Sequence, residues 1–135
     1  MSSFSTPLID LLGHALDLTA QRQTLVSQNI ANVDTPGYHT RDLDFREELQ
    51  QALSLDQTRE DQANQTGQPD QEVAAPAPFV REVPGLIERP DGNNVNIDRE
   101  SLLLAQDQLQ FQTEVAVLRS EFSRLQEAIS GGSSQ

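Results

Sequence analysis

The segment NIANVDTPGY, residues 29–38, divides the chain, because it ends one long amphipathic stretch and begins a turn-rich one. Asn32 and Asp34 readily hydrogen-bond to nearby backbone, and Pro36 disfavours helical geometry at the residue before it. Pro36 and Gly37 suit the central positions of a type II turn, the second of which needs a positive φ. This signature segment therefore predicts a helix end and an ordered loop, with Tyr38 directed back towards the helices or a neighbouring subunit.

A helix is expected before the turn, over residues 5–32. Thr6 can cap this helix, and Pro7 suits the first helical position. Apolar side chains then recur at three- and four-residue steps, which is the spacing of one helix face, and Arg22 and Asn29 lie on the same stripe. The expected packing residues of this helix are Leu8, Leu11, Ala15, Leu18 and Leu25.

A second and longer helix is expected over residues 97–130, with Asp98 as its N-cap and Gly131-Gly132 at its end. Its apolar residues follow a 3/4 alternation that is interrupted once, at Gln108. The expected packing residues are Leu104, Phe111, Val115, Leu118, Phe122, Leu125 and Ile129. The predicted fold is mainly α, with the two long terminal helices paired as an antiparallel coiled coil.

The part between these helices has a different character. Residues 33–53 are expected to form the loop and an extended segment, with Leu43 and Phe45 as apolar anchors. Residues 54–96 are expected to be a flexible acidic middle segment, because residues 54–78 of it are rich in Gln, Asp, Pro and Ala and have almost no large apolar side chain. A short β-hairpin is the regular structure that this middle segment could hold, over residues 79–89 with its turn at Pro84-Gly85.

Composition limits the core and the kinds of partner. Only 36% of the 135 residues are hydrophobic and 4% aromatic, so two helices alone bury too little for a robust single chain. We expect other copies or related subunits to supply the missing core. The net charge of −12 disfavours binding to nucleic acid and to anionic membrane surfaces. Direct insertion into a membrane is not expected either.

The sequence contains no recognisable catalytic, cofactor-binding or metal-binding residues and no small-molecule site. The chain has no cysteine, and neither His14 nor His39 has a paired histidine nearby. Asp91-Gly92-Asn93-Asn94 lacks the spacing of a calcium loop and is expected to be a turn that tolerates a side chain better than Gly37 does. The apolar run at residues 8–18 is interrupted by charges, so it is neither a secretory signal nor a membrane span.

A helix that ends in Asn-x-x-Asn-x-Asp-Thr-Pro-Gly-Tyr resembles the N-terminal signature of the bacterial flagellar axial proteins, which include rod, hook and hook-associated subunits. The following RDLDF at residues 41–45 and the late DGNNVNIDRE at 91–100 are similar to the branch that forms the proximal rod. The resemblance covers residues 5–50 and 90–129. The signature could also be no more than a good helix stop; the resemblance implies that it is an assembly loop, formed by Asn29, Asn32, Asp34, Thr35, Pro36, Gly37, Tyr38 and Phe45.

The resemblance implies a structural subunit of the basal-body rod, which transmits torque across the periplasm and is required for motility. Its implied partners are copies of itself, other rod subunits, the rod adaptor protein FliE, and the membrane ring and export gate. The implied route is the flagellar type III apparatus, without a cleaved signal peptide. Phe45 and Leu49 match a Phe-x-x-x-hydrophobic element read by the export gate, although local packing of two apolar residues explains them as well.

A different class of function stays open at this point. A helical-hairpin adaptor or secretion chaperone would also carry an apolar stripe, with which it would bind a single partner. A neighbouring gene for a second short chain with the same signature would favour the rod subunit over the adaptor.

Overall fold

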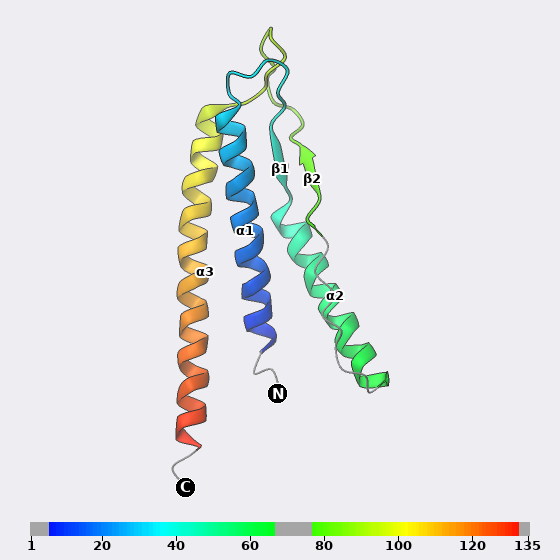
Figure 1. Cartoon of the computed structure of the whole chain (residues 1–135), viewed down its shortest axis with the longest axis vertical. Coiled ribbons are helices and arrows are strands. Elements are labelled where there is room, and N and C mark those ends of the chain that lie inside the picture. Colours follow the sequence, from blue (N-terminus) through cyan, green and yellow to red (C-terminus); the bar gives the residue numbers. More distant parts are fainter. Residues whose placement is uncertain (1–5, 67–76, 133–135) are drawn as a thin grey trace.

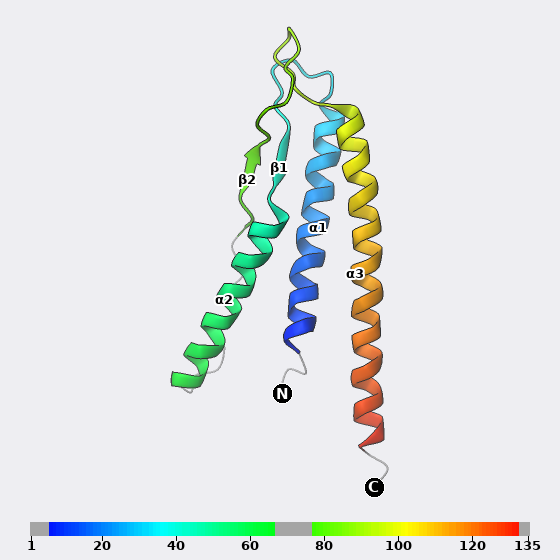
Figure 2. The ribbon, with the colours of Figure 1, turned by 180° about the vertical axis from the view of Figure 1, so that it is seen from behind.

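The computed structural model describes residues 6–66 and 77–132. The elements in chain order are α1 (Pro7–Ala31), β1 (Arg41–Leu43), α2 (Phe45–Thr66), β2 (Val80–Glu82) and α3 (Ile97–Gly131). Both views of the ribbon show α1 and α3 side by side and antiparallel, with α2 on the opposite side of α1 (Figures 1 and 2). The loop between α1 and β1 and the loop between β2 and α3 gather at the end where α1 finishes and α3 begins, which we call the head (Figure 1). The mainly helical fold is confirmed; the coiled-coil geometry of the α1–α3 pair stays a prediction.

The ends of α1 follow from local chemistry, as expected. Thr6 has an extended backbone, its Oγ1 accepts a 3.3 Å hydrogen bond from the backbone N of Ile9, and Pro7 is the first helical residue. At the other end, the backbone N–H of Asn32 still reaches the carbonyl oxygens of Gln28 and Asn29 before the chain turns away.

The start of α3 differs from the prediction by two residues. Asn96, not Asp98, is the N-cap, and its Oδ1 accepts hydrogen bonds from the backbone N of Asp98 and of Arg99 at 3.1 and 3.0 Å. Asp98 and Glu100 instead lie in the first turn, where a negative charge stabilises the helix. The helix ends at Gly131, with Gly132 as its C-cap, as expected.

The middle of the chain contains a helix that the sequence analysis missed. We expected an extended segment up to residue 53, but the extended part ends at Asp44, and residues 45–66 form α2. Asp44 Oδ1 accepts a 3.1 Å hydrogen bond from the backbone N of Glu47, and the helix contains no Gly or Pro. Residues 54–66 of the expected flexible segment are therefore helical, and residues 67–76 of it lie outside the described residues.

The prediction of a local hairpin over residues 79–89 is also wrong, because the strand in this segment pairs with a distant strand rather than with its neighbour. β2 pairs with β1, in antiparallel register Arg41↔Glu82, Asp42↔Arg81 and Leu43↔Val80. A 2.9 Å ion pair between Arg81 and Asp44 continues this long-range pairing. The strand after the signature segment is thus closed by a segment from much later in the chain.

The core is small and contains many polar groups. The buried apolar residues of the described chain are Ala15, Leu18, Val26, Leu43 and Val95. The buried polar residues are more numerous: Thr19, Asn29, Thr40, Asn93, Asn94, Glu100 and Asp107. Apolar burial alone is thus a weak source of stability for the single chain. Over the described ranges, none of the helices has the apolar length that a membrane crossing requires.

Candidate assembly site

Asn29 is the centre of the head and is completely buried. Its Nδ2 donates hydrogen bonds to the backbone O of Arg41 at 2.8 Å and to Oε2 of Glu100 at 2.9 Å. Its Oδ1 accepts from the hydroxyl of Tyr38 and from the backbone N of Arg41, both at 3.0 Å. All four hydrogen-bonding positions of the amide are used, so one side chain joins α1, the loop, β1 and α3.

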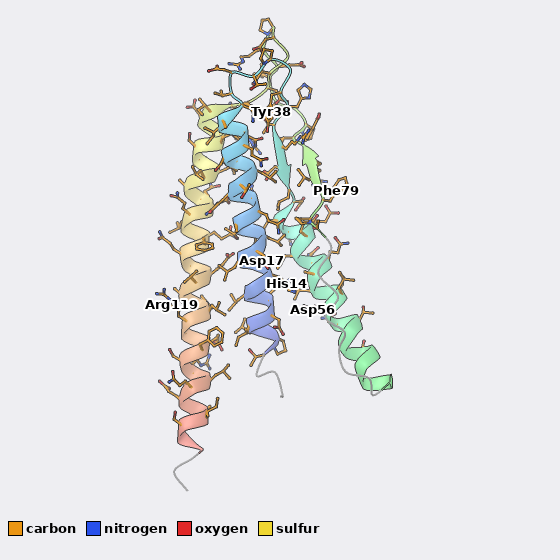
Figure 3. The ribbon with its side chains drawn as sticks, viewed as in Figure 1. His14, Asp17, Tyr38, Asp56, Phe79 and Arg119 are labelled. Atoms are coloured by element: carbon orange, nitrogen blue, oxygen red, sulfur yellow. The ribbon has the colours of Figure 1, made fainter. Side chains whose placement is uncertain are left out.

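The turn in the signature segment has the predicted geometry. The backbone N of Tyr38 donates to the carbonyl O of Thr35 at 3.2 Å, and Gly37 has φ +71°. These values confirm a type II turn with Pro36 and Gly37 at its centre. Tyr38 points back towards α1, and burial raises the pKa of its hydroxyl, which stays a neutral donor to Asn29 (Figure 3).

A second turn, residues 91–94, holds the first one in place, and we call it the asparagine turn. Asn93 Nδ2 donates to the carbonyl oxygens of Asn32 and Thr35 at 2.9 and 2.8 Å. Asn94 Oδ1 accepts from the backbone N of Thr40 at 2.7 Å. A turn was expected here from the sequence, but its partner was not, because the two contacting segments lie more than fifty residues apart.

The two turns touch through their glycines. The backbone N of Gly37 donates to the carbonyl O of Asp91 at 2.9 Å. Gly92 has φ +83°, and a Cβ at this position would lie 3.2 Å from the Cα of Gly37. Gly92 is therefore required both by its positive φ and by the close approach of the two backbones, whereas Gly37 is required by its positive φ alone.

Below Asn29, a network of charged side chains crosses the inside of the molecule. Asp42 accepts from Arg22 Nε at 3.1 Å and from Arg99 Nη2 at 3.4 Å, and Arg99 also pairs closely with Glu100. Asp107 lies 3.6 Å from Arg22. The two arginines thus face three carboxylates, in a region where unpaired charge is costly.

Asp107 is the least satisfied member of this network. It is 1% exposed, and its Oδ2 has no hydrogen-bond partner among the residues that the structure describes. Burial raises the pKa of this carboxyl, opposed by the charge of Arg22 and reinforced by Asp42, Glu114 and Glu100. This carboxyl is not among the residues expected from the sequence, because the apolar pattern of α3 gives no sign of it.

The face of α3 that meets α1 is centred on acidic side chains one heptad apart. Glu100 and Asp107 are buried, and Glu114 accepts hydrogen bonds from the hydroxyl of Thr19 at 3.0 and 3.2 Å. The expected apolar stripe lies beside this face. Leu104, Val115, Leu118 and Leu125 are half-buried, whereas Phe111, Phe122 and Ile129 are exposed.

The expected packing residues of α1 are more completely enclosed. Ala15 and Leu18 are buried, Leu11 and Leu25 are half-buried, and Leu8 at the start of the helix is 40% exposed. The remaining two named positions, Phe45 and Leu49, lie one turn apart at the start of α2 and are half-buried.

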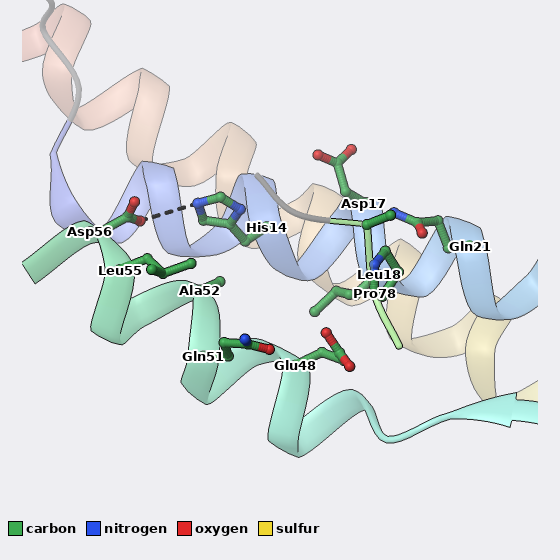
Figure 4. Close-up of a pocket in the computed structure, with 11 residues that line it drawn as sticks. His14, Asp17, Leu18, Gln21, Glu48, Gln51, Ala52, Leu55, Asp56 and Pro78 are labelled. Carbon is green, nitrogen blue, oxygen red and sulfur yellow. Dashed lines mark hydrogen bonds and ion pairs between the residues drawn. The ribbon is translucent and has the colours of Figure 1, made fainter. Parts of the chain in front are cut away.

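A groove lies between α1 and α2, with a cavity volume of about 370 Å³. Leu18 and Leu55 form apolar parts of its lining, and His14 Nε2 meets Asp56 Oδ2 at 3.1 Å across it (Figure 4). Asp17 and Glu48 add further carboxylates. Over residues 6–66 and 77–132, no cluster of three or more His, Asp or Glu side chains is arranged to hold a metal ion.

Comparison with known proteins shows which family this sequence resembles. Residues 9–39 match a family model described as flagella basal body rod protein. The chain is 37% identical to the flagellar basal body rod protein FlgB of Salmonella typhimurium over 127 residues, which cover 87% of this chain and 89% of the relative. It is 35% identical to the FlgB proteins of Escherichia coli and of Cereibacter sphaeroides, with the same shares covered.

Proposed function

The chain belongs to the flagellar basal body rod protein family, among the FlgB-type members, and from this premise we propose that it is the subunit of the proximal end of the rod. It is a structural subunit of the flagellar basal body, in a family of structural proteins rather than enzymes. The finer parts of the proposal concern how the subunit is held in the rod, what it contacts and how it reaches its place.

The observation that carries the proposal is the unfinished packing of α3. Phe111, Phe122 and Ile129 are 38%, 53% and 58% exposed, although they belong to one apolar stripe. A monomer gains nothing from a row of exposed aromatic and aliphatic side chains on a long helix. Neighbouring rod subunits would cover this stripe and complete a core that the single chain lacks.

The head suits the role of a rigid contact surface. The asparagine turn and Asn29 hold the signature segment from below, while Asp34, Thr35 and Pro36 remain exposed on top of it. Ile87, in the loop after β2, is 91% exposed. We propose that Asp34, Thr35, Pro36 and Ile87 contact the neighbouring subunits in the rod, because their supporting shell is already ordered before assembly.

Transmission of torque requires that α1, α3 and the head move as one body. The charged network from Arg22 to Glu100 links three elements by hydrogen bonds and ion pairs rather than by apolar contact alone. Such contacts have preferred directions, so they oppose sliding and rotation of α1 against α3. We propose that this network keeps the helix pair in register under load.

The proposal also includes neighbours and a route. The subunit would contact copies of itself, other rod proteins and, at its inner end, FliE and the membrane ring and export gate. It would pass through the flagellar type III apparatus, with Phe45 and Leu49 as the element that the gate reads. Both side chains are half-buried in the first two turns of α2, so the gate would read them in a partly unfolded chain.

Electron microscopy of purified basal bodies from cells that carry a tagged copy of this chain tests the proposal. The tag should appear at the membrane-proximal end of the rod, and deletion of the gene should leave cells non-motile. A tag that is found only in a soluble complex with one other protein would instead support the adaptor or chaperone, which the similarity to rod proteins does not favour.

A further inference from the structure

One edge of α3 combines an exposed phenylalanine and a half-buried valine with the positive charge of an arginine. Val115, Arg119 and Phe122 are spaced by four and three residues, so they form one ridge on the helix surface. Phe122 is 53% exposed, and Arg119 forms no ion pair within the part of the chain that the structure describes. Arg119 projects from the side of α3 that faces away from α1 (Figure 3).

The groove between α1 and α2 has the complementary character. Its apolar lining includes Leu18, Ala52 and Leu55, and its acidic lining includes Asp17, Glu48 and Asp56 against the single His14. Asp17 is exposed, and its carboxylate has no ion pair among the described residues. The cavity volume of about 370 Å³ lies within the roughly 300–1,000 Å³ range of protein pockets, which is large enough for side chains to enter.

The net negative charge of the chain makes the match between the ridge of α3 and the α1–α2 groove selective. The chain carries 21 acidic and 9 basic residues, so two copies repel each other in most orientations. A free arginine on an apolar ridge and a free aspartate beside an apolar groove are therefore an uncommon pair on this surface. Opposite charges placed in register select the one orientation that also buries the apolar residues.

We propose that the Val115–Arg119–Phe122 ridge of one copy docks into the α1–α2 groove of a second copy, with Arg119 paired to Asp17. The inference rests on the proposed function, in which copies of this chain are neighbours in the rod. Ridge and groove lie on different faces of the molecule, so each copy still offers a free ridge or a free groove after docking. Such a head-to-tail contact continues from copy to copy, as a rod layer requires, rather than closing as a symmetric dimer.

The absence of cysteine from the natural chain makes the contact measurable by crosslinking. Cells carry the full chain with Asp17→Cys and Arg119→Cys, and their purified basal bodies are treated with a short bismaleimide, because a disulfide would need the two Cα atoms within about 4.4–6.8 Å. We expect bands at multiples of the mass of this chain. Arg124→Cys with Asp17→Cys is the matched control: Arg124 is another exposed arginine of α3, already paired with Glu121 at 2.9 Å, and it lies on a different side of the helix.

Charge exchange gives a second test that needs no crosslinker. Arg119→Asp and Asp17→Arg should each lower incorporation into basal bodies on the order of tenfold, because each change places like charges in the contact. The double variant should recover incorporation, whereas Arg124→Asp should leave it near the natural level.

The outcomes separate this contact from the proposed function. A chain that is present in basal bodies but gives no specific 17–119 product, or that crosslinks through these positions only to a protein of different mass, overturns the docking of one copy on another. Equal products from the 17–119 and 17–124 pairs overturn it as well. If the natural chain is missing from basal bodies, the rod function itself fails, and the contact fails with it.

Discussion

The Nδ2 of Asn29 donates a 2.9 Å hydrogen bond to Oε2 of Glu100, and this contact ties the last turn of α1 to the first turn of α3. Both residues are completely buried, and Asn29 uses its other three positions on Arg41 and Tyr38. A single amide therefore fixes the relative height of the two long helices and the direction of the loop between them.

Asn29→Ala should destabilise the chain by about 2–4 kcal/mol, because it leaves several buried polar groups without partners. Helix content, measured by far-UV circular dichroism during thermal unfolding, should fall at lower temperature than in the natural chain. Gln28→Ala, at the exposed neighbouring position, is the control and should change little. If both variants unfold like the natural chain, then the hydrogen bonds of Asn29 do not hold the head together.

The buried carboxyl of Asp107 predicts a pH dependence. Its pKa in the folded state is raised by burial, so the folded chain binds this proton more tightly than the unfolded chain does. The contribution of this group to stability is therefore fully present below its ordinary pKa and is lost as pH rises through the raised value. Asp107→Asn should stabilise the chain at neutral pH, and the gain should shrink as the solution becomes more acidic.

The measurement is the difference in thermal unfolding temperature between Asp107→Asn and the natural chain, taken across pH. This difference reports the titration of Asp107 separately from that of Asp42, Glu100 and Glu114 around it. Glu127→Gln, at an exposed position of α3, should shift the curve little at any pH. An Asp107→Asn variant that is less stable at neutral pH would show that the ion pair with Arg22 outweighs the cost of burial.

The two glycines of the head give a third prediction, and the structure revises what the sequence suggested. Gly37 and Gly92 both have positive φ, but only at Gly92 does an added Cβ also meet backbone, at 3.2 Å from the Cα of Gly37. Gly92→Ala should therefore lower incorporation into basal bodies at least as much as Gly37→Ala, with a strain of about 1–2 kcal/mol from φ alone in each. The expectation that Gly92 is the more tolerant position follows from treating it as an isolated turn.

Gly13→Ala is the matched change within α1, where an added Cβ meets nothing within 4 Å and alanine favours the helix. It should be neutral or stabilising. Fractionation distinguishes export from assembly: the Gly92→Ala chain should leave the cytoplasm and be depleted in basal bodies. Retention of this variant in the cytoplasm would assign the head to export, and normal incorporation would mean that the two turns can separate without loss.

The ends of α1 and the turn after it could be predicted from sequence because their causes are local. Thr6, Pro7, Pro36 and Gly37 act on backbone within a few residues: the threonine caps the helix, the prolines fix their own φ, and the glycine readily adopts the positive φ of the turn. The identity of the family could be read from the same segment for the same reason, since the signature is contiguous.

The helix α2 and the polar interior could not be predicted in this way. The composition of α2 resembles that of a flexible acidic segment, because few of its apolar residues, among them Ala52 and Leu55, line the side towards α1, and a His14–Asp56 contact adds to them. Glu100 and Asp107 lie one heptad apart on a charged helix, and acidic residues at this spacing usually lie on a face that is exposed to solvent. Their burial depends on Asn29 and Arg22, which are far away in the sequence and which no local pattern connects to them.

The two halves of the α3 stripe give the last prediction, because the structure separates residues that the sequence grouped together. Leu118 is half-buried next to α1, whereas Phe122 is 53% exposed in the single chain. Leu118→Asp should lower both the helix content of the purified chain and motility, since it places a carboxylate in the α1–α3 contact. Phe122→Asp should leave the helix content unchanged and still abolish motility, since it damages only the surface that a neighbouring subunit covers. Ser123→Asp, at the adjacent exposed position, adds the same charge outside the stripe and should swim normally. Normal swimming of cells that carry Phe122→Asp would show that this side of α3 faces solvent in the rod, whereas a loss of helix content in the same variant would place Phe122 in the packing of the single chain.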